Sequence, residues 1–393
     1  MTTPLITSDA QALAVAEDVA QQLQAGSSDR DRERRLPHAE LALFSRSGLW
    51  AISVPKAFGG AGVSNVTLAQ VIARIAQADA SLGQIPQNHF YALEVLRVNG
   101  SPEQQKRLYA EALAGQRFGN ALAELGTKTA HDRTTRLSRD GAGYRIDGCK
   151  FYATGALYAQ RIPTSVVDDE GRQHLAFVPA DSQGVQVIDD WSGFGQRTTG
   201  SGSVQFDHVY VDADEVVPFD TAFERPTPVG PLAQILHAAI DTGIARAAYQ
   251  DTLQFVRTRS RPWIDSGLSK ASEDPLTLKS VGHLAIRLHA AEALLERAGE
   301  HLDRAQADTT AETVAAASIA VAEARAISTE IALAAGTTLF ELAGSQATLA
   351  EHNLDRHWRN ARVHTLHDPV RWKYHAIGNY YLNDEHPTRR GTI

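Results

Sequence analysis

The residues best suited to chemistry lie near the C-terminus of this chain. Residues 355–382 contain four histidines, four arginines and two tryptophans. His364 and His367 are three positions apart, so on a helix their imidazoles share one face. Asp368-Pro369 follows at once, and the proline predicts that the helix ends there. The spacing predicts two imidazoles and a carboxylate beside a helix end, where a buried site could use them; the alternative is two packed or solvated histidines.

The chain is poor in sulfur, with one cysteine, Cys149, and one methionine, Met1. Methionine usually fills gaps in protein cores, and leucine or isoleucine replaces it at small cost. Such avoidance suits a protein made when sulfur is scarce, although drift in a GC-rich genome is an alternative. A single cysteine excludes an intramolecular disulfide and a cysteine-built zinc site, and we expect no metal.

Charge and hydropathy narrow the class of protein. The net charge is −8 and the pI is about 6.0, which gives no indication of nucleic-acid binding. The N-terminus lacks a basic region followed by an apolar core, so we expect no signal peptide. We see no run of apolar residues long enough to cross a membrane. These features predict a cytoplasmic protein without membrane or nucleic-acid partners.

The period of the hydrophobic pattern changes twice, and it predicts an α+β chain in three domains. Residues 1–118 favour helices, at 10–23, 37–47, 66–78 and 102–113, with a charged connector at 29–35 and Ser101 as an N-cap. Residues 119–227 favour an antiparallel β domain, with strands near 144–146, 165–167, 175–178, 185–188 and 203–206. Pro226-Thr-Pro228 marks a boundary. Residues 228–393 favour a helix bundle, at 232–260, 276–305, 311–343 and 347–366.

The C-terminal segment resembles the acyl-CoA dehydrogenase family, which has Arg-Asp-Ala and then Tyr-Glu-Gly. Here Arg359-Asn360-Ala361 is followed by His367-Asp368-Pro369. Asp368 is one methylene shorter than the catalytic glutamate of the dehydrogenases, which argues against plain dehydrogenation. The pattern resembles instead the flavin-dependent monooxygenase branch of this fold, typified by dibenzothiophene monooxygenase. The resemblance extends from Gly48 to Gly378-Asn-Tyr-Tyr and implies the same three-domain order.

The resemblance also implies residues that hold a flavin. Lys150-Phe-Tyr-Ala-Thr-Gly155 is similar to the family's Lys-x-Trp-Ile-Thr-Asn, which places Thr154 near flavin N5 and O4 and Tyr152 beside the ring. Asn120, in Phe118-Gly-Asn, stands where relatives touch the isoalloxazine, and Trp191 would flank it. The alternatives are a threonine or asparagine that satisfies strand backbone, and a tryptophan of the core.

Further positions follow from the same resemblance. The segment 255–263 is similar to a family helix end whose arginine binds cofactor phosphate, which implies Arg259, with Arg261 as a second candidate. A solvated basic helix end is the alternative. His89 lies on a segment that reaches the active site in the monooxygenase branch. His367, His364 and His89 would stabilise or protonate a peroxide oxygen, while Thr154 and Asn120 hold the flavin edge.

The activity implied is that of a two-component monooxygenase. Residues 342–347 contain one glycine where dehydrogenases have a glycine-rich loop near the FAD adenine, which favours FMN over FAD. A separate NAD(P)H-dependent flavin reductase would supply reduced FMN, and O2 would oxidise a small organosulfur compound, with methanesulfinate to methanesulfonate preferred. Relatives imply a homotetramer. The alternatives are a dimethyl sulfone or thiophene monooxygenase, an FAD-dependent acyl-CoA dehydrogenase using Asp368, and a catalytically silent flavin-binding protein.

Overall fold

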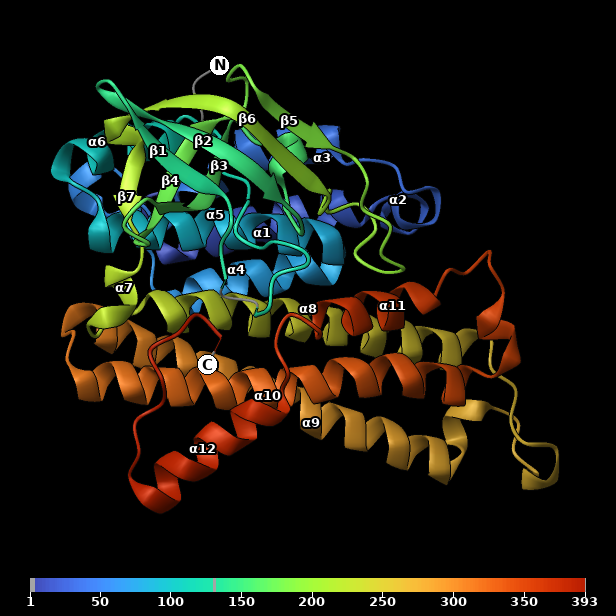
Figure 1. Ribbon diagram of the computed structural model, residues 1–393. Coiled ribbons are helices and arrows are strands. Elements are labelled where there is room, and N and C mark those ends of the chain that lie inside the picture. Colours follow the sequence, from blue (N-terminus) through green and yellow to red (C-terminus); the bar gives the residue numbers. More distant parts are fainter. Residues whose placement is uncertain (1–3, 130–131, 393) are drawn as a thin grey trace.

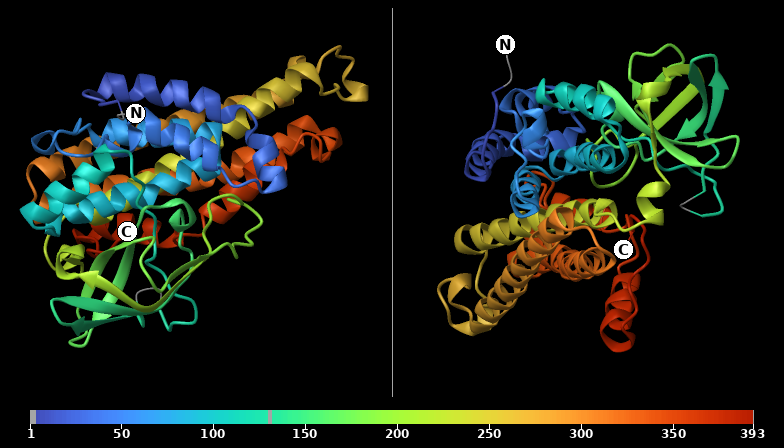
Figure 2. Two further views of the ribbon diagram at one scale, coloured as in Figure 1. Left: turned by 90° about the horizontal axis from the view of Figure 1, so that it is seen from above. Right: turned by 90° about the vertical axis from the view of Figure 1, so that its left-hand side faces the viewer.

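The computed structural model describes residues 4–129 and 132–392 and arranges them in three adjoining parts. N-terminal helices and a β-sheet lie side by side, and the C-terminal helices lie across both (Figures 1 and 2). One large apolar core joins the N-terminal helices to the bundle, and a second core lies within the sheet. The order helices, sheet, helices confirms the fold class predicted from the sequence.

The N-terminal part consists of helices that pack on one another and on the bundle. Ser101 caps the last of them in a capping box with Gln104, as predicted. The charged segment 29–35, predicted as a connector, is largely helical, because buried Arg30 bonds Asp79 at 3.1 Å and anchors the turn. The helices are α1 (Asp9–Gln24), α2 (Ser27–Glu33), α3 (His38–Ser47), α4 (Asn65–Ala78), α5 (Ala80–Asn99) and α6 (Pro102–Leu113).

The sheet has the order β5-β6-β2-β1-β3-β4-β7 within the described residues. Its neighbouring strands are antiparallel except for β1 and β3, which run parallel at Arg136↔Val167 and Leu137↔Asp168. The sheet is therefore mixed, and the prediction of a purely antiparallel domain is wrong at this pair. The pattern analysis missed β1 and β7, which are short and lack a clear apolar alternation. The strands are β1 (Arg136–Asp140), β2 (Gly143–Lys150), β3 (Arg161–Asp168), β4 (Gln173–Pro179), β5 (Val185–Ile188), β6 (Ser203–Asp212) and β7 (Val216–Pro218).

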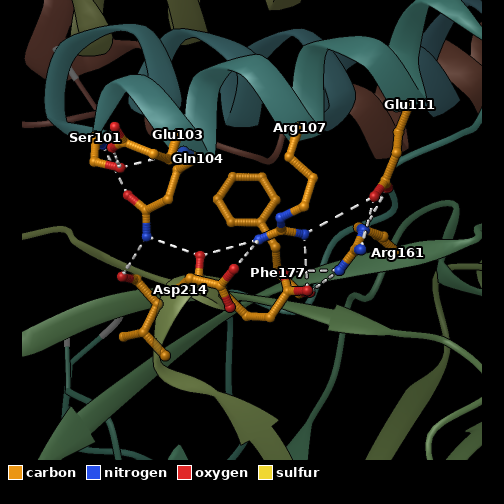
Figure 3. A network of polar contacts seen from close by, with 10 residues as sticks. Ser101, Glu103, Gln104, Arg107, Glu111, Arg161, Phe177 and Asp214 are labelled. Atoms are coloured by element: carbon orange, nitrogen blue, oxygen red, sulfur yellow. Dashed lines mark hydrogen bonds and ion pairs between the residues drawn. The ribbon is translucent and has the colours of Figure 1, made fainter.

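A polar network fastens α6 to the sheet (Figure 3). Arg161 of β3 bonds Glu111 at 2.7 Å, and Arg107 of α6 bonds Glu215 at 2.8 Å. The Gln104 amide donates to the Asp214 carbonyl at 2.9 Å. Arg161 also forms a parallel bridge with Phe118. The network therefore fixes the segment that leads from Phe118 into the site described below.

The C-terminal bundle is built on α8 (Val229–Thr258), α9 (Pro275–Ala307) and α10 (Ala311–Ala343). The alanines of α10 allow close packing against α8 and α9. α11 (Asp355–His364) starts later than predicted, because a 3-10 turn at Ser345–Thr348 and a left-handed Asn353 interrupt the chain first. α12 (Arg371–Asn383) projects away from the bundle, and the chain then returns to α8 (Figure 1).

By length and composition alone, one helix of the described residues, α10, could cross a membrane. Half of the relevant window is buried inside the protein, and the core helix of a globular bundle meets the same criterion. The contacts of α10 with α8, α9, α11 and α12 explain its apolar character as packing.

Candidate active site

Three histidines meet where α8 and α11 lie together. His237 lies on α8, His364 is the last residue of α11, and His367 lies in the turn that follows. Their ring centres are 5.1 Å apart for His237 and His364, 4.6 Å for His237 and His367, and 4.8 Å for His364 and His367. The predicted pairing of His364 with His367 near a helix end is present, although His367 lies just beyond the helix.

A buried ion pair orients this cluster. Asp241 Oδ1 accepts from His364 Nδ1 at 2.5 Å, and Arg325 of α10 pairs with the other oxygen of Asp241. Burial opposes ionisation of Asp241, but Arg325 and His364 outweigh it and lower its pKa. His364 therefore carries its proton on Nδ1, and its Nε2 accepts from His237 Nδ1 at 3.1 Å. The order Asp241, His364, His237 forms one hydrogen-bonded chain.

His367 is exposed and has one nitrogen bonded to a side chain rather than to the main chain. Its Nδ1–H donates to the His364 carbonyl at 2.7 Å, so Nε2 is the basic nitrogen and accepts from the Gln84 amide at 3.1 Å. The side chain is reached by solvent, yet desolvation by the surrounding protein and the nearby His364 lower its pKa to about 4. Burial and the two other histidines hold the pKa of His237 well below its usual range. Both His237 and His367 are neutral at pH 7.

The sheet supplies the other half of the site. The Asn120 amide donates to the Tyr152 carbonyl at 3.1 Å, and Tyr152 has a positive φ of 55°. Thr154 Oγ1 lies 2.7 Å from Ser201 Oγ, and the Tyr152 ring contacts Trp191 edge-on at 6.2 Å. The predicted residues Asn120, Tyr152, Thr154 and Trp191 are thus neighbours.

A loop joins this half to the helical half. The Gln196 N–H donates to Asn360 Oδ1 of α11 at 2.7 Å, and the Trp191 indole donates to the Gln196 carbonyl at 2.9 Å. Gly195 lies so close to α11 that a Cβ there would be 2.0 Å from the Arg359 carbonyl. Any side chain at Gly195 would separate the two halves, which explains the glycine.

The structure does not support the predicted catalytic role of His89. Its Nε2–H donates to the Trp50 carbonyl at 2.7 Å, and its Nδ1 accepts from the Phe118 N–H at 3.1 Å. The side chain is fully buried, so neither nitrogen is free for a substrate. His89 instead fixes Phe118, two residues before Asn120.

Arg259 and Arg261 lie apart from the histidine cluster within one chain. Both are exposed and follow the C-terminal end of α8. His237 lies on the same helix 22 positions earlier than Arg259, which corresponds to roughly 33 Å of helix. A phosphate contact by these arginines therefore stays a prediction.

Asp368, which a dehydrogenase would use as its base, is held in a buried hydrogen-bond network. Buried Asp368 accepts from the Gln234 amide at 2.9 Å, and Gln234 accepts in turn from Lys373 Nζ at 2.9 Å. Asp368 is therefore engaged by an amide that a lysine holds in place.

Sequence reasoning missed three residues that the structure brings to the site: His237, Gln84 and Gln196. A signal existed for the first, since His237 and Asp241 stand one turn apart within the mostly apolar stretch 235–245 of α8.

Family models support this architecture. The chain matches the acyl-CoA dehydrogenase N-terminal domain over residues 8–116 and the acyl-CoA dehydrogenase C-terminal domain over residues 235–372. The chain belongs to the acyl-CoA dehydrogenase family.

Similar proteins identify the branch. Dibenzothiophene monooxygenase of Mycolicibacterium goodii is 33% identical over 95% of this chain and 94% of that protein. The probable FMNH2-dependent monooxygenase SfnC of Pseudomonas putida is 32% identical over 98% of each. The chain is therefore of the flavin-dependent monooxygenase branch, as the sequence analysis predicted.

Solved structures agree. FMN-bound TdsC from Paenibacillus sp. A11-2 superposes with a TM-score of 0.93 at 33% identity, over 97% of this chain and 100% of that one. Methanesulfinate monooxygenase MsuC from Pseudomonas fluorescens superposes with a TM-score of 0.90 at 31% identity, over 97% and 99%.

Proposed function

We propose that this protein is a two-component monooxygenase that uses reduced FMN and O2 to oxidise a small sulfinate, with methanesulfinate as the preferred substrate. The observation that carries the proposal is the meeting of two unlike surfaces. One is a sheet edge with unpaired polar groups that suit a flavin. The other is a histidine cluster in which His237 and His367 are neutral, and it suits proton transfer.

The sheet edge fits a flavin chemically. Asn120 Oδ1 and both side-chain polar atoms of Gln196 are buried without a hydrogen-bond partner in the described residues. Unpaired buried polar atoms are costly, by about 1–3 kcal/mol each, so such a site is completed by a ligand with donors and acceptors. The isoalloxazine edge carries both kinds of group. Asn120, Gln196 and Thr154 would hold that edge, with Tyr152 and Trp191 beside the ring.

Reduced FMN, when bound, supplies the electrons that activate O2. The overall reaction then balances: sulfinate, O2 and reduced FMN give sulfonate, oxidised FMN and water. The chain's own task is to manage protons and exclude competing reactions. His367 keeps Nε2 basic beside the Gln84 amide, and Asp241 fixes the tautomer of the neighbouring His364. His367 would take up and return a proton at Nε2, and a positioned acid or base contributes about 10²–10⁴-fold.

Several observations favour a small sulfur substrate. One similar protein, SfnC, is named a probable FMNH2-dependent monooxygenase. Another, MsuC, is named a methanesulfinate monooxygenase. The chain has one cysteine and one methionine, which fits expression under sulfur limitation. A sulfinate is a small anion, and the imidazole and amide groups of His367 and Gln84 could donate to its oxygens after protonation of His367.

The proposal includes a reductase partner and an assembly. A separate NAD(P)H-dependent reductase would provide reduced FMN in the cytoplasm. We also propose a homotetramer, because α12 leaves the bundle with large apolar side chains exposed, among them Trp372 and Leu382. In such an assembly Arg259 or Arg261 of a neighbouring subunit would bind the cofactor phosphate.

The first rival is FAD-dependent acyl-CoA dehydrogenation with Asp368 as the base. Asp368 is buried and engaged by Gln234, with Lys373 behind it, and it would have to leave that bond to reach a substrate. Dimethyl sulfone and thiophene-type compounds remain the rival substrates, since dibenzothiophene monooxygenases are equally similar to this chain.

One experiment separates these possibilities. Sulfonate formation from methanesulfinate is measured with FMN, a flavin reductase, NADH and O2, in parallel with dimethyl sulfone and dibenzothiophene. Octanoyl-CoA with an artificial electron acceptor tests the dehydrogenase. We expect oxygen-dependent turnover of methanesulfinate and none of octanoyl-CoA. Anaerobic flavin bleaching by the acyl-CoA, abolished in Asp368→Asn, would establish the rival.

A further inference from the structure

The three histidines of the site have a feature that flavin chemistry does not require. Their ring centres form a nearly equilateral triangle with sides of 4.6–5.1 Å. A metal ion 2.0–2.1 Å from one nitrogen of each imidazole would place the ring centres about 5 Å apart. The side chains of His237, His364 and His367 are therefore already spaced as in a three-histidine metal site.

The candidate ligand nitrogens of the three histidines also lie close together. Candidate ligand atoms of the three side chains all lie within 4.8 Å of one another. His237 Nδ1 and His364 Nε2 are 3.1 Å apart, close to the roughly 3.3 Å that tetrahedral coordination demands. His367 would turn its Nε2 from Gln84 toward the other two nitrogens. It lies in a solvent-accessible turn beyond the end of α11, where such a movement is easiest.

The surroundings supply the second layer of contacts that metal-binding histidines have. A ligating imidazole usually donates its other N–H to a carboxylate or a backbone carbonyl, which fixes the tautomer. His364 donates to Asp241, and His367 donates to the His364 carbonyl. Both imidazoles consequently keep the lone pair of Nε2 available for a metal; His364 Nε2 faces His237, and His367 Nε2 faces Gln84. Arg325 holds Asp241 ionised in place.

We propose that His237, His364 and His367 form a binding site for a divalent transition-metal ion such as Zn²⁺, and that occupation of this site inhibits the enzyme. The ligands are three imidazole nitrogens, which leaves the fourth position of a tetrahedral ion to water on the exposed side of His367. The proton shared by His237 and His364 moves to Nε2 of His237 when the metal binds. The ion takes the lone pair of His367 away from Gln84, and with it the base that the proposed reaction uses.

This site revises the expectation, drawn from the single cysteine, that the chain binds no metal. A cysteine count excludes thiolate sites, but it does not address three imidazoles that come from two separate segments. The prediction of binding concerns the protein without flavin, so it can fail while the proposed oxygenation holds. Oxygenation can likewise fail while the metal site holds.

The test is titration of the metal-stripped, flavin-free full chain with Zn²⁺ by calorimetry and with Co²⁺ by visible absorption. We expect one equivalent to bind and Co²⁺ to give the absorption bands of four-coordinate nitrogen ligation. His237→Gln and His367→Gln should each weaken binding at least tenfold. In the oxygenation assay Zn²⁺ should inhibit in proportion to its occupancy, and a chelator should restore turnover.

The chain offers a matched control. Asp147, Asp207 and His208 form a second group that could hold a metal, but Asp207 and His208 are exposed. His208→Gln should leave the stoichiometry and affinity unchanged, with circular dichroism confirming that every variant is folded. The proposal would be overturned if both His237→Gln and His367→Gln still bound one Zn²⁺ with the wild-type affinity. It would also be overturned if the wild-type chain showed no saturable Zn²⁺ binding.

Discussion

His89 lies in the N-terminal helical region and His367 in the C-terminal bundle, yet their imidazoles have similar pKa values. Desolvation lowers the pKa of each imidazole to about 4. In the N-terminal region both nitrogens of His89 are bonded to main-chain groups, and the ring is fully buried among Trp50, Phe90 and Phe118. In the turn after α11, His367 keeps one nitrogen for an exchangeable partner and meets solvent.

The comparison shows that a perturbed pKa does not by itself identify a functional histidine. Burial produces the same shift at a structural position and at an accessible one. What separates the two is whether a nitrogen is left for a substrate. The substitutions below are ordered by the size of the effect expected from that difference.

His367→Ala should have the largest effect. It removes the only accessible basic nitrogen described in the cluster, so turnover of methanesulfinate should fall about 10²–10⁴-fold. The melting temperature should change little, because the side chain is reached by solvent. Product formed per NADH consumed, with hydrogen peroxide measured alongside, reports the loss. Unchanged coupling would make His367 a structural residue like His89.

His89→Ala should lower the stability of the fold. It leaves the Phe118 N–H and the Trp50 carbonyl unpaired in the core and opens a cavity, so the free energy of unfolding should fall by about 3 kcal/mol. Urea unfolding measures this, with exposed His208→Ala as the control. His89→Gln, which keeps a donor for Trp50, should recover part of the loss. Turnover per folded molecule should fall less than tenfold; a loss as large as that of His367→Ala would restore the catalytic role.

The same residue predicts a pH dependence of stability. The folded-state pKa of His89 is about 4 and the unfolded value is 6.5, so protonation favours the unfolded chain. Its contribution is fully present above pH 6.5 and is lost as the pH falls toward 4. Between pH 7 and pH 5 the loss from this group should be about 2 kcal/mol. Between pH 7 and pH 5 the free energy of unfolding, measured with urea, should fall by about 2 kcal/mol more in the wild type than in His89→Gln. Equal decreases in the two proteins would contradict the assignment.

Asn120→Ala should have the smallest effect. The substitution removes a donor to Tyr152 and the unpaired oxygen assigned to the flavin, so FMN should bind about tenfold more weakly, or 1.4 kcal/mol. Fluorescence titration of the flavin gives the dissociation constant. Exposed Asn383→Ala is the control. If Asn120→Ala and Asn383→Ala bound FMN with equal affinity, Asn120 would not be a flavin contact.

The sequence predicted the elements of this fold better than the contacts of its site. Long periodic segments such as 311–343 were located correctly, because helix packing imposes a regular apolar pattern. The partners of His89 could not be found that way, since Trp50 and Phe118 are distant in sequence and contribute main-chain atoms. Gln84 was missed for the same reason: its partner, His367, is 283 positions away.

The scarcity of sulfur has a consequence of another kind. Enzymes that reduce O2 with a flavin release hydrogen peroxide when the reaction misfires, and thiols and thioethers are the side chains that peroxide attacks first. Here Leu, Ile, Val and Ala fill the described core. The only thiol, Cys149, is exposed, but partial desolvation and the nearby carboxylates of Asp190 and Glu124 raise its pKa, which disfavours the reactive thiolate. The chain therefore offers almost nothing for a stray oxidant to damage, and it should keep its activity in peroxide concentrations that inactivate methionine-rich proteins.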